Sequence, residues 1–147
     1  MRLAAHGIAM DLPAGWDGRI WARAGGGPVV HAANIPLPAS DGDFATRATD
    51  RLPGDGVVVV LVEYAASEAG TPLFSAPVPA RVDPAELSPA TLLRRRPGQR
   101  GLQRFFTVAG RAMCLYVVVG SAAHASDLAA GVSDILATLQ VAPSTGR

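Results

Sequence analysis

Two uninterrupted apolar runs indicate the centre of a sheet. Residues 57–62 are all apolar and β-branched at five of six positions, and residues 113–119 form a second run without polar alternation. A strand with one solvent-exposed face alternates polar and apolar residues. Because neither run alternates, both are expected to be covered on both faces. Residues 104–120 are typical of a hairpin that turns at Ala109–Gly110.

Shorter patterns predict further strands before these runs. Residues 7–13 and 16–23 indicate two short strands joined at Pro13–Gly15, and residues 29–35 resume a strand after a glycine-rich turn. Trp16 and Trp21 lie five positions apart and therefore face opposite sides of their strand. We expect one of the two rings to lie in the core and the other to be exposed on a contact surface.

Helical spacing appears twice. Residues 40–54 predict a short helix that Asp41 or Asp43 caps. A longer helix is expected at residues 126–141, with Ser126 as its N-cap and an apolar stripe formed by Leu128, Val132, Ile135, Leu136 and Leu139. Gly131 lowers the stability of that helix by about 1 kcal/mol relative to alanine, which a closely passing backbone would explain.

The order of these elements departs from regular strand–helix alternation and favours an α+β fold. We predict a mainly antiparallel sheet with helices on its faces, an α/β/α sandwich whose C-terminal helix packs on the sheet. One domain at residues 1–141 and a flexible tail at 142–147 account for the chain. The stretch between residues 67 and 101 holds six prolines and is expected to be a long excursion with a helical turn near residues 83–93.

Both ends of the chain resemble PsbP-like domains. The opening IAMDLPAGW is similar to their apolar strand followed by Pro-x-Gly-Trp, and GRAMCLYVVVG with SDILATLQV is similar to their closing strand and helix. The resemblance implies the antiparallel-sheet sandwich that these domains share with a Ran-binding nuclear-transport factor and bacterial effector chaperones. It also implies an accessory or partner-binding protein rather than an enzyme, and it transfers no site residues.

The amino-acid composition and net charge disfavour some classes of function. The net charge is only +1, which disfavours a dedicated nucleic-acid binder. Residues 81–111 nevertheless hold seven arginines against two acids, whereas residues 1–80 hold five arginines against eight acids. One cysteine excludes an internal disulfide, and no apolar run suits a signal peptide or a membrane span. A cytoplasmic location is expected.

The strongest local chemical pattern is LRRRPGQRGLQRFF, residues 93–106, in which five of fourteen residues are arginine. Forked guanidinium donors suit phosphate or carboxylate groups, and Phe105 and Phe106 are the residue type on which bases stack. Three alternatives stay open: a solvated loop, a contact with an acidic protein or anionic lipid, and nucleic acid. We expect a protein partner, with nucleic acid and membrane disfavoured, and predict as contact residues Arg94, Arg95, Arg96, Arg100, Arg104 and Trp21.

Catalytic, cofactor and metal signatures are not apparent. Cys114 lies in an apolar strand and is expected in the core, and the histidines lack ligand spacing. Ser121 and His124 suit turn and capping roles. The predicted function is therefore a non-enzymatic accessory or protein-binding module without cofactor. Two alternatives remain: a small-molecule or lipid domain with an apolar pocket between sheet and helix, and a structural subunit of a homo- or hetero-oligomer in which basic and acidic regions meet.

Overall fold

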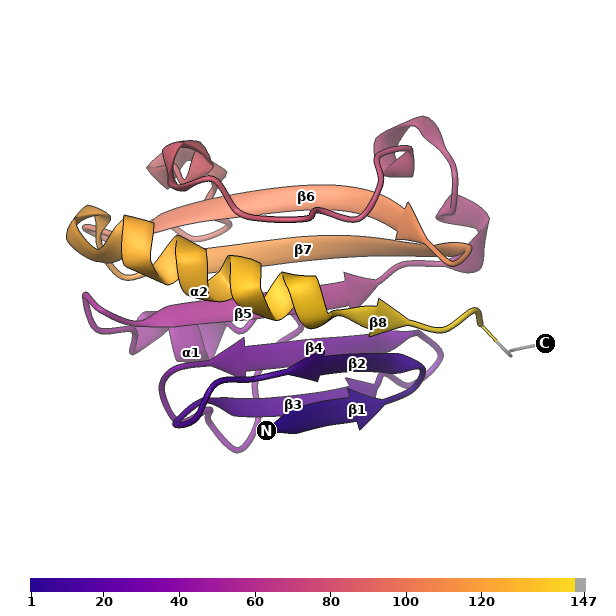
Figure 1. The fold of residues 1–147 in the computed structure, drawn as a ribbon, viewed down its shortest axis with the longest axis horizontal. Coiled ribbons are helices and arrows are strands. Elements are labelled where there is room, and N and C mark those ends of the chain that lie inside the picture. Colours follow the sequence, from indigo (N-terminus) through magenta and orange to yellow (C-terminus); the bar gives the residue numbers. More distant parts are fainter. Residues whose placement is uncertain (145–147) are drawn as a thin grey trace.

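The computed structural model describes residues 1–144 and shows a five-stranded antiparallel sheet in the order β3-β4-β5-β7-β6 (Figure 1). A second, three-stranded sheet has the order β1-β2-β8. The strands and helices are β1 (Arg2–Ala5), β2 (Ile8–Asp11), β3 (Asp17–Ala22), β4 (Pro28–Ala33), α1 (Thr46–Asp50), β5 (Val57–Glu63), β6 (Arg100–Val108), β7 (Arg111–Val119), α2 (Ala125–Thr138) and β8 (Gln140–Val141).

The two uninterrupted apolar runs form the inner strands β5 and β7, which pair antiparallel with Val60 opposite Tyr116. Every residue of β7 is buried, as the absence of alternation predicts. The β6–β7 hairpin turns at Ala109 and Gly110, whose φ angles of 53° and 74° suit the two central positions of a type I′ turn. These features confirm the predicted α+β fold with a mainly antiparallel sheet.

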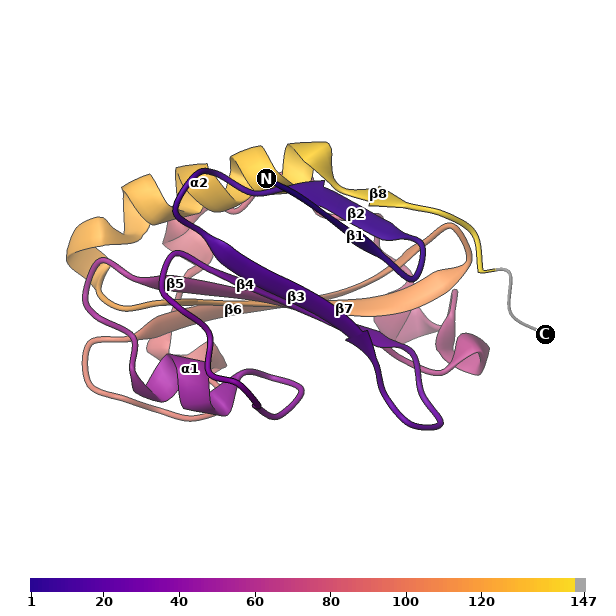
Figure 2. The same ribbon diagram turned by 90° about the horizontal axis from the view of Figure 1, so that it is seen from below.

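One face of the large sheet is covered by α2 together with the small β1-β2-β8 sheet (Figure 2). The core on this side is built from alternate residues of the central strands, such as Val59 and Val117, and from Val132 and Ile135 of the helix. The C-terminal helix therefore packs on the sheet as expected.

Long connections and the single short helix α1 cover the opposite face (Figure 2). Asp41 caps this helix, because its carboxylate accepts hydrogen bonds from the backbone N–H groups of Arg47 and Ala48. The helix is shorter than the predicted residues 40–54, since Ala45 has a left-handed φ of 57° and the regular turns start only after it. This second layer is thus mostly irregular chain.

The excursion between β5 and β6 runs along the outer edge of β6 (Figure 1). It forms backbone pairs at two places, where Ser88 bridges Gly101 and where the N–H of Thr107 donates to the carbonyl of Ala76. It contains four short 3₁₀ turns, at Ala66–Glu68, Pro72–Phe74, Pro84–Glu86 and Pro89–Thr91. The excursion therefore occupies a sheet edge that would otherwise offer unpaired backbone groups.

A buried ion pair joins the two sheets. The Arg111 guanidinium donates to both carboxylate oxygens of Glu63, at 2.7 and 3.1 Å, and also to the carbonyls of His6 and Ala142. The two charged side chains are 6% and 13% exposed. One guanidinium thereby holds the β1–β2 turn and residue 142 against the central strands, whereas the last three residues of the expected tail lie outside the described part of the chain.

Three expectations about α2 are wrong. The predicted end at residue 141 is too late, because the helix ends at Thr138 and residues 140–141 form β8. His124 occupies the N-cap position without a side-chain cap bond, and Ser126 lies inside the first turn. The preceding 3₁₀ turn at Ala122–His124 leads directly into the helix, so no separate cap residue is needed. A Cβ at Gly131 would meet nothing within 4 Å, so no backbone passes there.

The tryptophan rings face opposite sides of the sheet, as their spacing predicts. Trp16 packs on the α2 side and Trp21 on the α1 side. Both are half-buried, so the expected division into one core ring and one exposed ring is wrong. Trp21 instead contacts the His31 ring edge-on at 4.6 Å, which gives it a neighbour on its own sheet face. Among the helices described, none is long and apolar enough to cross a membrane.

Candidate functional site

Residues 88–100, here called the arginine loop, are tied to the sheet at both ends. Ser88 and Gly101 exchange two backbone hydrogen bonds of 2.9 Å. Midway, the backbone N–H of Leu93 donates to the Tyr116 hydroxyl at 2.9 Å. Burial raises the pKa of Tyr116, although the bond from Leu93 opposes this effect, so the phenol is neutral at pH 7.

The second half of the arginine loop turns sharply and is held against α1. The backbone N–H of Gln99 donates to the carbonyl of Arg96, and Gly98 has a φ of 82°, as the third position of a type II turn requires. The buried Gln99 carboxamide donates to the carbonyl of Thr49 at 2.7 Å. These contacts fix the loop backbone before any ligand arrives.

Asp50, at the end of α1, neutralises part of the arginine cluster. Its carboxylate lies 2.6 Å from the Arg96 guanidinium and 4.0 Å from that of Arg94. Consecutive side chains in an extended segment point to opposite sides, so Arg94 and Arg96 reach the same carboxylate while Arg95 points away. The three consecutive arginines therefore do not act as one patch.

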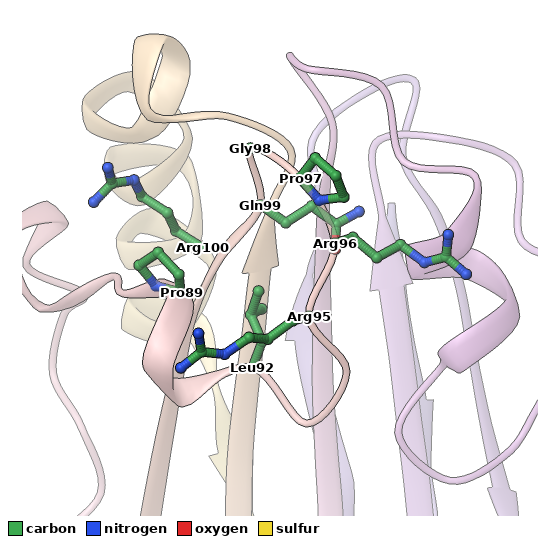
Figure 3. Close-up of a pocket in the computed structure, with 8 residues that line it drawn as sticks. All are labelled: Pro89, Leu92, Arg95, Arg96, Pro97, Gly98, Gln99 and Arg100. Carbon is green, nitrogen blue, oxygen red and sulfur yellow. The ribbon is translucent and has the colours of Figure 1, made fainter.

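Arg95 and Arg100 extend to the same side of the loop, flanking Pro89, while Arg96 points to the other side (Figure 3). Within residues 1–144, neither Arg95 nor Arg100 has a carboxylate within salt-bridge distance. Both line a solvent-open pocket of about 470 Å³ that is formed by residues 95–100 with Pro89 and Leu92. The pocket lining contains no acidic residue, so its charged groups are all hydrogen-bond donors.

The remaining predicted contact residues lie elsewhere. Arg104 forms an ion pair with Glu86, which is supplied by a neighbouring 3₁₀ turn. Trp21 lines a separate pocket of about 270 Å³ together with Arg19 and residues 39–41. The structure thus brings Arg95, Arg96 and Arg100 together in one pocket lining. Arg94 lies outside that lining but shares Asp50 with Arg96, whereas Arg104 and Trp21 have other partners.

The two phenylalanine side chains that follow the arginines pack against other residues of the chain. Phe106 is 1% exposed in the core under α2. Phe105 forms edge-on contacts with Phe74 and Tyr64, at ring distances of 5.4 and 6.0 Å. Neither ring forms an open stacking platform beside Arg95 and Arg100.

The nucleophilic and acid–base candidates Cys114, His31 and Ser121 are buried or hydrogen-bonded to backbone carbonyls. Burial raises the pKa of Cys114 to about 11, so its thiol is not ionised at neutral pH. Burial has the opposite effect on His31, whose pKa it lowers, and the Nε2 of this ring donates to the carbonyl of Asp43 at 2.8 Å. Ser121 donates to the carbonyl of Gly54. Within residues 1–144, no group of three or more His, Cys, Asp or Glu side chains has an arrangement that would hold a metal ion.

Sequence reasoning identified the arginines of the pocket but missed Asp50, Pro89 and Leu92. The Arg-Pro-Gly-Gln turn was detectable from its proline and glycine, but Asp50 lies more than forty positions before its arginine partners. The apolar floor made by Pro89 and Leu92 also had no distinguishing pattern. Comparison of the chain with family models, with curated proteins and with solved structures gave no match.

Proposed function

We propose that this chain is a non-enzymatic accessory module that binds an acidic region of a protein partner through the arginine loop. The observation that carries the proposal is the pair Arg95 and Arg100, two guanidinium groups without a carboxylate on a preformed pocket. Several other arginines have an acidic partner within the chain, as Arg104 has in Glu86. Two cations left without an acid on one rigid loop suit an external anion.

Apolar contact would add to this attraction. Leu93 is 54% exposed and directly precedes the arginines, and Leu92 and Pro89 form the floor of the pocket. Interfaces combine such an apolar centre with charged groups at the rim. The resemblance to PsbP-like domains also implies an accessory role, and the cytoplasmic location predicted from the sequence is part of the proposal.

The test compares two double variants that remove the same charge. Arg95→Ala/Arg100→Ala removes the unpaired pair, and Arg51→Ala/Arg81→Ala removes two exposed arginines that lie outside the pocket and have no ion pair within residues 1–144. Each tagged protein is incubated with a nuclease-treated extract of the source cells. A recovered protein is then purified and titrated directly against all three baits by calorimetry at two salt concentrations.

We expect a partner that binds the wild type and the Arg51/Arg81 variant equally and loses at least about tenfold in affinity for the Arg95/Arg100 variant, since the two charge contacts together should contribute about 1.4 kcal/mol or more. Binding should weaken as salt rises. Equal affinity for all three proteins would place the contact outside the arginine loop and refute the proposal.

A further inference from the structure

We propose that the anion held between Arg95 and Arg100 is a phosphate monoester rather than a carboxylate. This inference rests on the proposed function for the location of the site and specifies the chemistry recognised there. The carrier of the phosphate group is either a side chain of a protein partner or a small molecule, because both present the same oxygens.

The number and direction of the donors favour phosphate. One guanidinium fork satisfies both oxygens of a carboxylate in a bidentate pair, as the Arg111–Glu63 contact illustrates within this chain. The pocket offers two forks, Arg95 and Arg100, which lie on either side of Pro89 (Figure 3). A phosphate monoester has three terminal oxygens and a charge of about −1.5 to −2 at pH 7, so it engages both forks and matches their combined charge.

The internal pairing in the loop leaves these two arginines available. Asp50 lies 2.6 Å from Arg96 and 4.0 Å from Arg94. The Arg96 side chain extends to the side of the loop opposite to Arg95 and Arg100 (Figure 3). Gln99 is buried and bonded to Thr49, so the turn that separates Arg95 from Arg100 is fixed. A fixed loop loses little conformational entropy on binding, which favours a site of only two charged groups.

The size of the pocket indicates that the phosphate is attached to a larger group. About 470 Å³ falls in the range of small-molecule sites, and the floor contributed by Leu92 and Pro89 is apolar. The bare ion would leave this floor uncovered. An ester whose carbon side rests on the floor uses both parts of the pocket.

The experiment titrates the ¹⁵N-labelled protein with four probes at constant ionic strength and follows amide shifts. The probes are phenyl phosphate, benzoate, a phosphoserine peptide and the same peptide with glutamate in place of phosphoserine. Phenyl phosphate and benzoate share the apolar ring and differ in the anion. The matched proteins are again Arg95→Ala/Arg100→Ala and Arg51→Ala/Arg81→Ala, with circular dichroism as the check that each is folded.

We expect phenyl phosphate to shift the amides of residues 88–100 and to bind at least about tenfold more tightly than benzoate. That binding should be lost in the Arg95/Arg100 variant and kept in the Arg51/Arg81 variant. A phosphoserine peptide that binds more tightly than phenyl phosphate identifies a protein as the carrier, whereas weaker peptide binding identifies a small molecule.

Three outcomes overturn the inference, and they separate it from the proposed function. If benzoate or the glutamate peptide binds as tightly as its phosphate counterpart, phosphate recognition is refuted while an acidic protein partner stands. If the Arg95/Arg100 variant still binds phenyl phosphate, the site lies elsewhere. If no probe shifts residues 88–100, phosphate recognition is refuted and the arginine loop loses its support as an anion site.

Discussion

The buried Arg111–Glu63 pair allows a quantitative test of how the two sheets are held together. Replacing one partner, by Arg111→Met or Glu63→Leu, leaves the other charge buried and unpaired. Because the side chains are only 6% and 13% exposed, each single change should lower the free energy of unfolding by about 3–5 kcal/mol. Replacing both removes the unpaired charge, so the double variant should lose no more than either single variant.

The coupling follows from these values. The effects of the two single changes should exceed the effect of the double change by about 3 kcal/mol, the upper end of the range for residues in contact. The carbonyls of His6 and Ala142 lose their donor in the Arg111 variants, but both residues are exposed and water replaces it. Their contribution to the coupling is therefore small.

Urea unfolding measured by tryptophan fluorescence gives all four free energies, since Trp16 and Trp21 pack on the two faces of the sheet. The surface pair Arg2–Asp11, whose side chains are 53% and 55% exposed, is the control and should show a coupling of less than about 1 kcal/mol. Additive effects in the Arg111–Glu63 cycle, with the double variant losing the full sum, would refute the reasoning.

Four smaller predictions concern single positions. Gly131→Ala should stabilise the protein by about 1 kcal/mol, because its Cβ enters open space on α2; thermal unfolding measures the gain, and a loss would contradict it. Gly120→Ala should destabilise by about 1–3 kcal/mol or fail to fold, since its Cβ would lie 1.8 Å from the carbonyl oxygen of Pro53. Burial lowers the pKa of His31 from 6.5, so the unfolded chain binds a proton before the folded protein does as pH falls. The free energy of unfolding should therefore be at its full value above pH 6.5 and decline below it. His31→Gln should make the free energy of unfolding, measured by urea titration, less dependent on pH in this range. The thiol of Cys114, whose pKa is about 11, should resist iodoacetamide at pH 8 until the protein unfolds, and rapid labelling of the native protein would show that the strand opens.

The sheet was predictable where its pattern is unambiguous. The apolar runs that became β5 and β7 have no polar position on either face, and only an inner strand accommodates that. By contrast, β8 was missed because its two residues are too few for a period to appear. β1 was missed because its sequence Arg-Leu-Ala-Ala holds one large apolar side chain and none of its residues is buried. The length of α1 was overestimated since Ala45 adopts a left-handed conformation that its side chain does not signal.

The candidate site was predictable as a region but not as a geometry. Arginine density located the loop, and the Pro-Gly pair located its turn. Which arginines remain unpaired depends on Asp50, a long-range contact that no local pattern contains. Arg104 was grouped with the loop because it lies in the same arginine-rich stretch, and Trp21 because of its residue type; in the structure Arg104 pairs with Glu86 and Trp21 lines a separate pocket.

The position of Asp50 also bears on how strongly the arginine loop would attract a polyanion. Affinity for DNA or RNA grows with each cation that contacts a backbone phosphate. Each such contact makes the logarithm of the binding constant fall more steeply with the logarithm of the salt concentration, by about 0.9 in the slope for duplex DNA. Asp50 pairs with Arg96 and lies 4.0 Å from Arg94. Of the four arginines in the loop, only Arg95 and Arg100 therefore have no acidic partner among the described residues, and their combined charge matches that of one dianion. If the loop binds an external anion as proposed, Asp50 competes with that anion for Arg96. We therefore expect Asp50→Asn to be retained longer on heparin without a gain in stability.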